Sequence, residues 1–297
     1  MRSVTLMSRA VFKTMRGRPL ESFMNLGEAL RYATCTDPGV VRLHNEDSIA
    51  ADPAMGLVVL ADGMGGHNAG EVASGIATTI ITTQLEGLLP HLDVAQFDDC
   101  ALRARLRELL LEQVHHANVS IFQTAQNDSA FSGMGTTLVS ALFCDNAVVV
   151  VHVGDSRMYR LRDGELECLT RDHSLLQEQV DAGLISPEQA RVSVHRNLVT
   201  RALGVHPIVE PELADFEVRV GDIYLFCSDG LNDMVPDEDI ALTLNALGGN
   251  LQSAADQLVH LANDNGGRDN ISVVLVRVDR EYGVSRSILA RLKSRLG

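Results

Sequence analysis

Short runs of apolar, mostly β-branched residues recur along the chain, and several of them lead directly into an aspartate. Three such runs, each with the aspartate that follows it, are residues 57–60 with Asp62, residues 147–153 with Asp155, and residues 223–227 with Asp229. A fourth aspartate, Asp269, comes just before the run at 271–278. Runs of this length and composition are typical of buried β-strands. The pattern therefore predicts a set of apolar strands that each carry an aspartate at one end.

The runs at residues 136–143 and 147–153 lie close enough in sequence to indicate a hairpin. Only Cys144, Asp145 and Asn146 separate them. Tight connections of this kind join antiparallel strands, whereas parallel strands need a long crossover. The spacing therefore disfavours a doubly wound parallel sheet.

Helical periodicity lies between the predicted strands, at residues 69–89, 101–125, 173–182 and 251–262. Ser186 followed by Pro187 is a further helix start, with a capping side chain and then proline in the first turn. The stretch 172–204 is rich in polar residues, and we expect it to form an excursion beside the active site. Long helices flanking antiparallel strands predict an α+β fold, a four-layer α-β-β-α sandwich of two antiparallel sheets covered by helices.

The chain shows no internal repeat, low-complexity tract or Pro/Gly-rich linker that would mark a second domain. Residues 1–28 lack a clear period and carry several basic residues, so we expect a loosely held extension there. Residues 29–280 are predicted to form one domain. Residues 281–297 contain a basic amphipathic stretch that predicts a short C-terminal helix.

Composition narrows the functional classes. At 297 residues and 45% hydrophobic content, the chain can bury a large core. Its formal net charge of −14 and pI near 5.1 would repel nucleic-acid phosphates and anionic lipids, which argues against both as partners. The five cysteines are widely spaced without a Cys-x-x-Cys pair, so we expect reduced thiols. No apolar run is long enough to span a bilayer, and we expect a cytoplasmic location.

Aspartates at several strand ends matter because neighbouring strand ends of a sandwich can converge on one rim. Any one of these residues taken alone is more simply explained as a turn residue. Several carboxylates held close together, however, would repel one another and raise one another's pKa. Divalent cations relieve that repulsion and prefer oxygen ligands. The set therefore predicts a metal site.

The segment 61–67, with the sequence Ala-Asp-Gly-Met-Gly-Gly-His, is the strongest single motif. It is not a dinucleotide loop, because a G-x-G-x-x-G pattern begun at Gly63 would need glycine where Asn68 stands. The chain has no Gly-Lys pair that could form a P-loop. A tight strand-to-helix turn would explain the glycines but not Asp62 and His67.

Upstream, Arg42 lies close to Asn45, Glu46 and Asp47, a grouping that in isolation suits a surface salt-bridge cluster. The ordered motifs of the whole chain favour another interpretation. They are Arg42 with Asn45-Glu46-Asp47, Asp62-Gly63-Met64-Gly65-Gly66-His67, Gly133-Met134-Gly135-Thr136-Thr137, Gly154-Asp155-Ser156-Arg157, Ser228-Asp229-Gly230, and Arg268-Asp269-Asn270. From about Arg31 to Val278, the chain resembles the bacterial members of the PPM family, the metal-dependent phosphatases often called type 2C.

The resemblance implies metal-ligand roles for specific residues. Asp62 would bridge two metal ions, and Gly63 would offer its backbone carbonyl to one of them. Asp229 and Asp269 would hold the other ion. Asp155, together with Asp229, resembles the weaker third-metal site found in many members of the family.

Three further residues receive roles from the same resemblance. Glu46 and Asp47 would act mainly through metal-bound water, and Arg42 would bind the phosphate. The segments 170–174 and 196–204 also match the family, and they bracket a flap that in the family contributes to substrate choice.

The resemblance implies hydrolysis of phosphoserine and phosphothreonine in proteins, with two Mn²⁺ or Mg²⁺ ions and a weaker third as cofactors. A water activated by the two metals would attack the phosphate in line. A seryl or threonyl alkoxide is a poor leaving group and needs a general acid, for which His67 is the candidate. The expected partners of this monomer are phosphorylated proteins, including a Ser/Thr kinase or its substrates.

Two alternatives remain open at this stage. A binding module that keeps the fold could sequester phosphoproteins, although a surface that only binds has no need of Asp62, Asp229 and Asp269 together. A phosphatase dedicated to one signalling protein would carry the same ligands.

Overall fold

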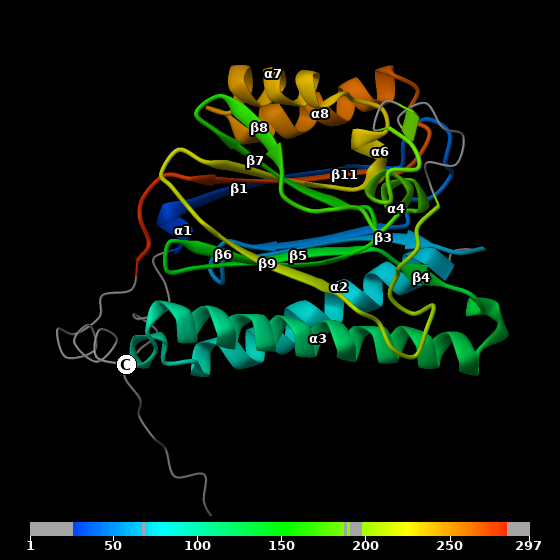
Figure 1. Ribbon diagram of the computed structural model, residues 1–297, viewed down its shortest axis with the longest axis horizontal. Coiled ribbons are helices and arrows are strands. Elements are labelled where there is room, and N and C mark those ends of the chain that lie inside the picture. The colour runs from blue at the N-terminus through cyan, green and yellow to red at the C-terminus, as the bar shows by residue number, and fades with distance from the viewer. Residues whose placement is uncertain (1–25, 67–68, 187–188, 191–197, 284–297) are drawn as a thin grey trace, which may run out of the picture.

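Two antiparallel sheets packed face to face form the centre of the computed structural model, which describes residues 26–66, 69–186, 189–190 and 198–283 (Figure 1). The helices are α1 (Leu26–Ala29), α2 (Ala69–Leu88), α3 (Asp99–Asn127), α4 (Leu175–Asp181), α6 (Asp229–Asn232), α7 (Asp237–Leu247) and α8 (Leu251–Asp264). The strands are β1 (Leu30–Asp37), β2 (Asp47–Asp52), β3 (Leu57–Met64), β4 (Gly135–Thr136), β5 (Leu138–Cys144), β6 (Ala147–Val153), β7 (Arg157–Arg162), β8 (Glu165–Cys168), β9 (Glu212–Glu217), β10 (Ile223–Cys227) and β11 (Ile271–Val278).

One sheet has the strand order β1-β11-β10-β7-β8, and the other has the order β2-β3-β5-β6-β9, with the short β4 paired to β3. The strand pairs within both sheets are antiparallel. Helices α7 and α8 cover the outer face of the first sheet, while α2 and α3 cover the outer face of the second (Figure 1). The predicted four-layer α+β sandwich is therefore confirmed.

The central strands are mostly apolar because both of their faces are covered. On β3, Leu57 and Val59 pack toward α2 and α3, while Val58 and Leu60 point into the space between the sheets. β10 and β11 follow the same alternation between the layer of α7 and α8 and the inter-sheet layer. Since successive side chains of a strand point to opposite faces, a strand buried on both sides offers few polar positions until it ends. Asp155, Asp229 and Asp269 accordingly lie just beyond the ends of their strands.

The predicted hairpin is present as β5 and β6, in which Cys144 and Ala147 are directly paired. Asp145 and Asn146 form the turn, with φ angles of 53° and 54°. Two successive positive φ values are required by the type I′ turn that favours tight hairpins, and Asp and Asn tolerate them better than most residues.

The predicted helices at 69–89, 101–125, 173–182 and 251–262 correspond to α2, α3, α4 and α8, with ends that differ by a few residues. Ser174 caps α4 by accepting a hydrogen bond from the backbone N–H of Gln177. Helix α7 was not predicted. It buries only Ile240, Thr243 and Leu244, which leaves an apolar stripe too narrow to give a clear period.

Several predictions concern residues outside the described ranges. They include the extension as far as residue 25, His67, Pro187 and the C-terminal helix beyond residue 283. Within the described part of the chain, no helix combines the length and apolarity that a bilayer crossing would require. The five cysteines are free thiols.

Candidate metal centre

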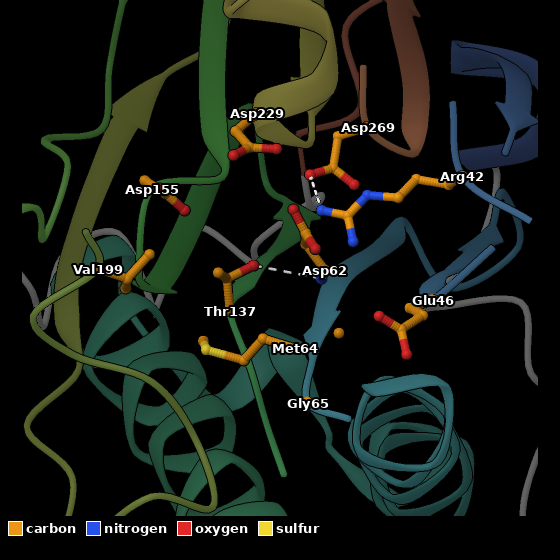
Figure 2. A pocket seen from close by; sticks show the side chains of 11 residues that line it. Arg42, Glu46, Asp62, Met64, Gly65, Thr137, Asp155, Val199, Asp229 and Asp269 are labelled. Atoms are coloured by element: carbon orange, nitrogen blue, oxygen red, sulfur yellow. Dashed lines mark hydrogen bonds and ion pairs between the residues drawn. The ribbon is translucent and has the colours of Figure 1, made fainter. Parts of the chain in front are cut away.

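Carboxylates from both sheets meet at one end of the sandwich. Asp62 lies near the end of β3, Asp155 follows β6, Asp229 follows β10 and Asp269 precedes β11. Figure 2 shows their side chains turned toward a common space. That space is a cavity of about 250 Å³.

The cavity is lined by Arg42, Glu46, Asp62, Gly63, Met64, Gly65, Thr137, Asp155, Val199, Asp229 and Asp269. The structure thus brings together most of the residues that the sequence singled out, although they are spread over more than two hundred positions of the chain. Asp47 is not part of the lining and is the register partner of Asp62, which is. His67 falls outside the described residues.

Asp47 and Asp62 are register partners on the antiparallel strands β2 and β3. The hydroxyl of Ser228 donates a hydrogen bond of 2.8 Å to Oδ2 of Asp47. The other carboxylate oxygen, Oδ1, is buried and receives no hydrogen bond from the described residues. A buried carboxylate oxygen without a donor is costly, so this arrangement favours a cation nearby.

The electrostatics of the cluster point the same way. Loss of contact with bulk water is the main cause that raises the pKa of Asp47 to about 6 and that of Asp155 to about 7. The same desolvation, followed by the charges of neighbouring aspartates, raises the pKa of Asp62 and Asp229 well above the usual range. Without cations the cluster therefore disfavours full ionisation at neutral pH.

The residues fit hard divalent cations such as Mg²⁺ or Mn²⁺. The side chains that converge on the cavity offer carboxylate oxygens, which these ions prefer, rather than the thiolates and imidazoles typical of zinc sites. Asp62, Asp229 and Asp269 could hold such ions, and Asp155 and Glu46 line the same cavity.

Gly63 is required by the close approach of β3 to the start of α2. A Cβ atom at this position would lie 2.2 Å from the carbonyl oxygen of Gly70 and 2.5 Å from that of Glu46. The backbone N–H of Gly63 also donates to the carbonyl of Glu46 at 3.1 Å. Glycine at this position thus allows Glu46, Asp62 and the beginning of α2 to share one small space.

Arg42 reaches the cavity from the loop between β1 and β2. Its Nη2 lies 2.6 Å from Oδ2 of Asp269, and its side chain is 51% exposed. Asn270 holds this loop: its side-chain amide donates to the carbonyls of Pro38 and His44 and accepts from the backbone N–H of Glu46. The motif that contains Asp269 therefore also positions the arginine.

Thr137 is a cavity residue to which the sequence assigned no role. Its Oγ1 accepts a hydrogen bond of 3.2 Å from the backbone N–H of Asp62, and its own N–H donates to the Asp62 carbonyl at 2.9 Å (Figure 2). Thr136 donates its hydroxyl to the same carbonyl at 2.8 Å. The backbone of Asp62 is thus fixed by the last residue of β4 and by Thr137, which follows it. The sequence signal for Thr137 was its place at the end of the motif at 133–137. The local pattern could not show that this motif pairs with the strand that carries Asp62.

Asp233 is a second residue without an assigned role. It follows α6, four positions after Asp229, and its charge contributes to the raised pKa values of Asp155 and Asp229. Residues four positions apart lie on the same side of a helical turn, so the spacing from Asp229 could have indicated that Asp233 lies near the site.

Comparison with known proteins identifies relatives. The family model described as Protein phosphatase 2C matches residues 40–275. The serine/threonine protein phosphatase PstP of Mycobacterium tuberculosis is 43% identical over 262 residues, which are 88% of this chain and 48% of that protein. The chain thus spans about half the length of this relative. The serine/threonine phosphatase Stp of Listeria monocytogenes is 37% identical over 247 residues, which are 82% of this chain and 94% of that protein.

A solved structure extends the likeness to the fold. The catalytic domain of the serine/threonine protein phosphatase PstP, in complex with two manganese ions, matches with a TM-score of 0.72 and 41% sequence identity. The match covers 85% of this chain and 99% of that one.

Proposed function

The chain belongs to the protein phosphatase 2C family, and from that premise we propose that it hydrolyses phosphoserine and phosphothreonine in proteins, using two divalent cations. The observation that carries this proposal is the convergence of Asp62, Asp229 and Asp269 on one cavity with Arg42 at its mouth. A surface that only bound phosphoproteins would not need several carboxylates gathered where an anion must enter.

The proposed metal ligands are the residues for which membership of the family implies that role, and most of them line the cavity. Asp62, Asp229 and Asp269 would hold two Mn²⁺ or Mg²⁺ ions, with the backbone carbonyl of Gly63 as a further ligand. Glu46 and Asp47 would act mainly through water. Asp155 would contribute, with Asp229, to a third and weaker position. When bound, the cations supply positive charge for the phosphoryl group and lower the pKa of water, so that hydroxide is available near neutral pH.

Arg42 would bind the phosphoryl group of the substrate. Its planar guanidinium can donate to two phosphate oxygens at once in a fork that the single ammonium nitrogen of lysine cannot reproduce. Because the side chain is half exposed at the cavity mouth, it can exchange its contact with Asp269 for a phosphate without being extracted from a packed core.

The chain's own thiols do not offer a nucleophile at this site. Cys227 is buried in β10, and burial raises the pKa of its thiol far above the usual range. A thiol of this kind is not ionised at neutral pH. Direct attack by water therefore suits the site better than a covalent phosphocysteine, and His67 is the candidate to protonate the leaving oxygen.

The proposed substrates are phosphorylated proteins, including a Ser/Thr kinase or the proteins that it modifies, and the proposed form is a cytoplasmic monomer. Support comes from the relatives, which are named serine/threonine phosphatases. A phosphatase dedicated to one signalling protein would differ in how fast it acts on unrelated phosphopeptides.

The test is release of phosphate from several unrelated phosphoserine and phosphothreonine peptides by metal-free protein to which Mn²⁺ is added back. We expect many turnovers per protein molecule, and none in chelator. Mn²⁺ and phosphopeptide binding without any release of phosphate would overturn the proposal in favour of a binding module. Turnover of one protein substrate alone, with all peptides left intact, would favour the dedicated phosphatase.

A further inference from the structure

His173 joins two parts of the cavity wall. Its backbone N–H donates to the carbonyl of Gly154 at 2.9 Å, and its ring Nδ1 accepts from the N–H of Gly154 at 3.2 Å. Its carbonyl accepts from the N–H of Thr200 at 2.8 Å. One residue thus holds Gly154 by two hydrogen bonds and Thr200 by a third.

Both of the residues that His173 holds stand next to cavity residues. Gly154 precedes Asp155, and Thr200 follows Val199, and both Asp155 and Val199 line the cavity (Figure 2). The link to Val199 is reinforced by the residues after His173, because Ser174 pairs with Val199 in an isolated bridge. Displacement of His173 would therefore move a proposed metal ligand and a wall on the substrate side together.

The turn at Gly154 can adopt few other arrangements. Its φ is +105°, and a Cβ there would lie 2.6 Å from Cβ of Thr137. Gly154 is thus packed closely against Thr137, another cavity residue. The backbone N–H and C=O of Gly154 are both hydrogen-bonded to His173. Loss of the ring would leave the Gly154 N–H without its acceptor in a buried place, which is unfavourable for a backbone donor.

The ring of His173 is itself held on its other sides. It is 6% exposed and stacks on His152, with centroids 4.9 Å apart and an angle of 18° between the rings. Since the Gly154 N–H occupies Nδ1, the proton of the neutral ring lies on Nε2, which is 3.4 Å from Oε2 of Glu212. Glu212 is also the register partner of His152 on β9.

His152, His173 and Glu212 come within 4.8 Å of one another through atoms that can bind metals, but their geometry favours hydrogen bonding. Nε2 of His152 lies 2.8 Å from the carbonyl oxygen of Arg171, which can only accept, so this nitrogen carries a proton. The two rings are nearly parallel, and the lone pairs of parallel rings do not converge on one ion. The three residues serve better as an anchor than as a zinc site.

From these contacts we infer that His173 is a positioning residue: it fixes Asp155 and Val199 in one arrangement, so that the weakest metal position and the recognition of protein substrates depend on the same side chain. This inference rests on the proposed function. A buried partner of this kind that orients a metal ligand typically changes metal affinity by about 10–100-fold when it is removed.

The experiment compares His173→Ala with His173→Asn, whose side-chain oxygen can replace Nδ1 as the acceptor for Gly154. His260→Ala is the matched control, because His260 is exposed on α8 at a distance from the cavity. Bound Mn²⁺ is counted by electron paramagnetic resonance during titration of metal-free protein, and kcat and KM are measured with a phosphothreonine peptide and an aryl phosphate.

In His173→Ala we expect the weakest Mn²⁺ position to lose about 10-fold or more in affinity while the tighter positions keep theirs. The KM for the peptide should rise more than the KM for the aryl phosphate. His173→Asn should recover most of both effects, and His260→Ala should match the wild type. Wild-type Mn²⁺ binding in His173→Ala, equal weakening of all positions, or failure of His173→Asn to improve on alanine would each overturn the inference. The Mn²⁺ count needs no turnover, so a wild-type protein that binds metal without releasing phosphate would refute the proposed function separately.

Discussion

Asp47 and Asp62 lie directly opposite each other on β2 and β3, at the edge of a cavity that already holds the carboxylates of Asp155, Asp229 and Asp269. Like charges in directly opposed positions destabilise a sheet. The fold nevertheless keeps them there, and Oδ1 of Asp47 has no donor among the described residues. A cluster of this kind lowers the stability of the metal-free protein and gives divalent cations a strong reason to bind.

The first prediction concerns the stability of the metal-free protein as a function of pH. Desolvation raises the pKa of folded Asp47 to about 6 and that of Asp155 to about 7, whereas an aspartate in the unfolded chain titrates near ~3.9. Between these values the folded protein binds more protons than the unfolded chain, so the free energy of unfolding falls as pH rises. We expect the melting temperature in chelator to fall as pH rises from about 4 through about 7. The raised pKa values of Asp62 and Asp229 add to this fall.

Two controls belong to this experiment. Asp47→Asn should make the pH profile shallower, because it removes one of the titrating aspartates. Saturating Mn²⁺ should raise the melting temperature most at the upper end of the range. A metal-free protein whose melting temperature rises steadily with pH across this window would contradict the account.

The second prediction concerns Arg42. Since its pair with Asp269 is half exposed, the pair contributes little to stability, within about 1 kcal/mol. Arg42→Ala should therefore leave the melting temperature and Mn²⁺ binding nearly unchanged. It should raise KM for a phosphopeptide by about 10-fold or more, because a charge-assisted contact with phosphate is lost. Arg42→Lys should recover only part of the loss, since lysine cannot bind two oxygens in a fork. An unchanged KM with lower stability would assign Arg42 a structural role instead.

The third prediction tests the close approach at Gly63. Gly63→Ala should destabilise the fold by about 1–3 kcal/mol, because its Cβ meets the Gly70 carbonyl at 2.2 Å and the backbone must shift. It should also weaken Mn²⁺ binding, since Asp62 moves with the same strand. Gly75→Ala is the matched control: Gly75 lies within α2 with no neighbour near a new Cβ, and alanine there should stabilise by about 0.5–1 kcal/mol. Thermal melts of both variants with and without Mn²⁺ provide the measurement. Equal melting temperatures for the two variants would show that the close packing of β3 against α2 does not exclude a side chain at position 63.

The sequence predicted the metal cluster through strands that are buried on both faces. Residues of β3 and β10 are apolar because two layers cover them, so their first carboxylates, Asp62 and Asp229, mark the end of the sheet. Strand β2 lacks this signature, because all of its residues are only partly buried, and its position beside β3 could not be predicted. The opposition of Asp47 and Asp62 was therefore visible only in the structure.

Long-range contacts were hidden for a related reason. Arg42 and Asp269 are 227 positions apart, and nothing in either local pattern indicates that they pair. The contact between His173 and Gly154 likewise depends on how the segment after β8 returns across the end of β6. Local motifs were enough to select each candidate residue. The contacts between these residues depend on how the layers pack, which local motifs do not show.

The fourth prediction concerns His67, the residue that the sequence analysis proposes as the general acid. His67→Ala should slow hydrolysis of a phosphoserine peptide more than hydrolysis of an aryl phosphate, because an aryl oxide leaves without needing a proton. The kcat values for the two substrates under saturating Mn²⁺ give the comparison. Equal losses on both substrates would remove His67 from that role.

The central claim is that Asp62, Asp229 and Asp269 hold divalent cations for phosphate hydrolysis, and Asp229→Asn tests it most directly. The substitution keeps the shape of the side chain and removes one charge from the ligand set. The measurement is Mn²⁺-dependent release of phosphate from a phosphothreonine peptide by the wild type and the variant, each with its bound Mn²⁺ counted. We expect metal-dependent turnover in the wild type and, in the variant, a folded protein that has lost bound Mn²⁺ and nearly all turnover. Full turnover by a variant that has lost bound Mn²⁺, or a wild type that turns over equally well in chelator, would contradict it.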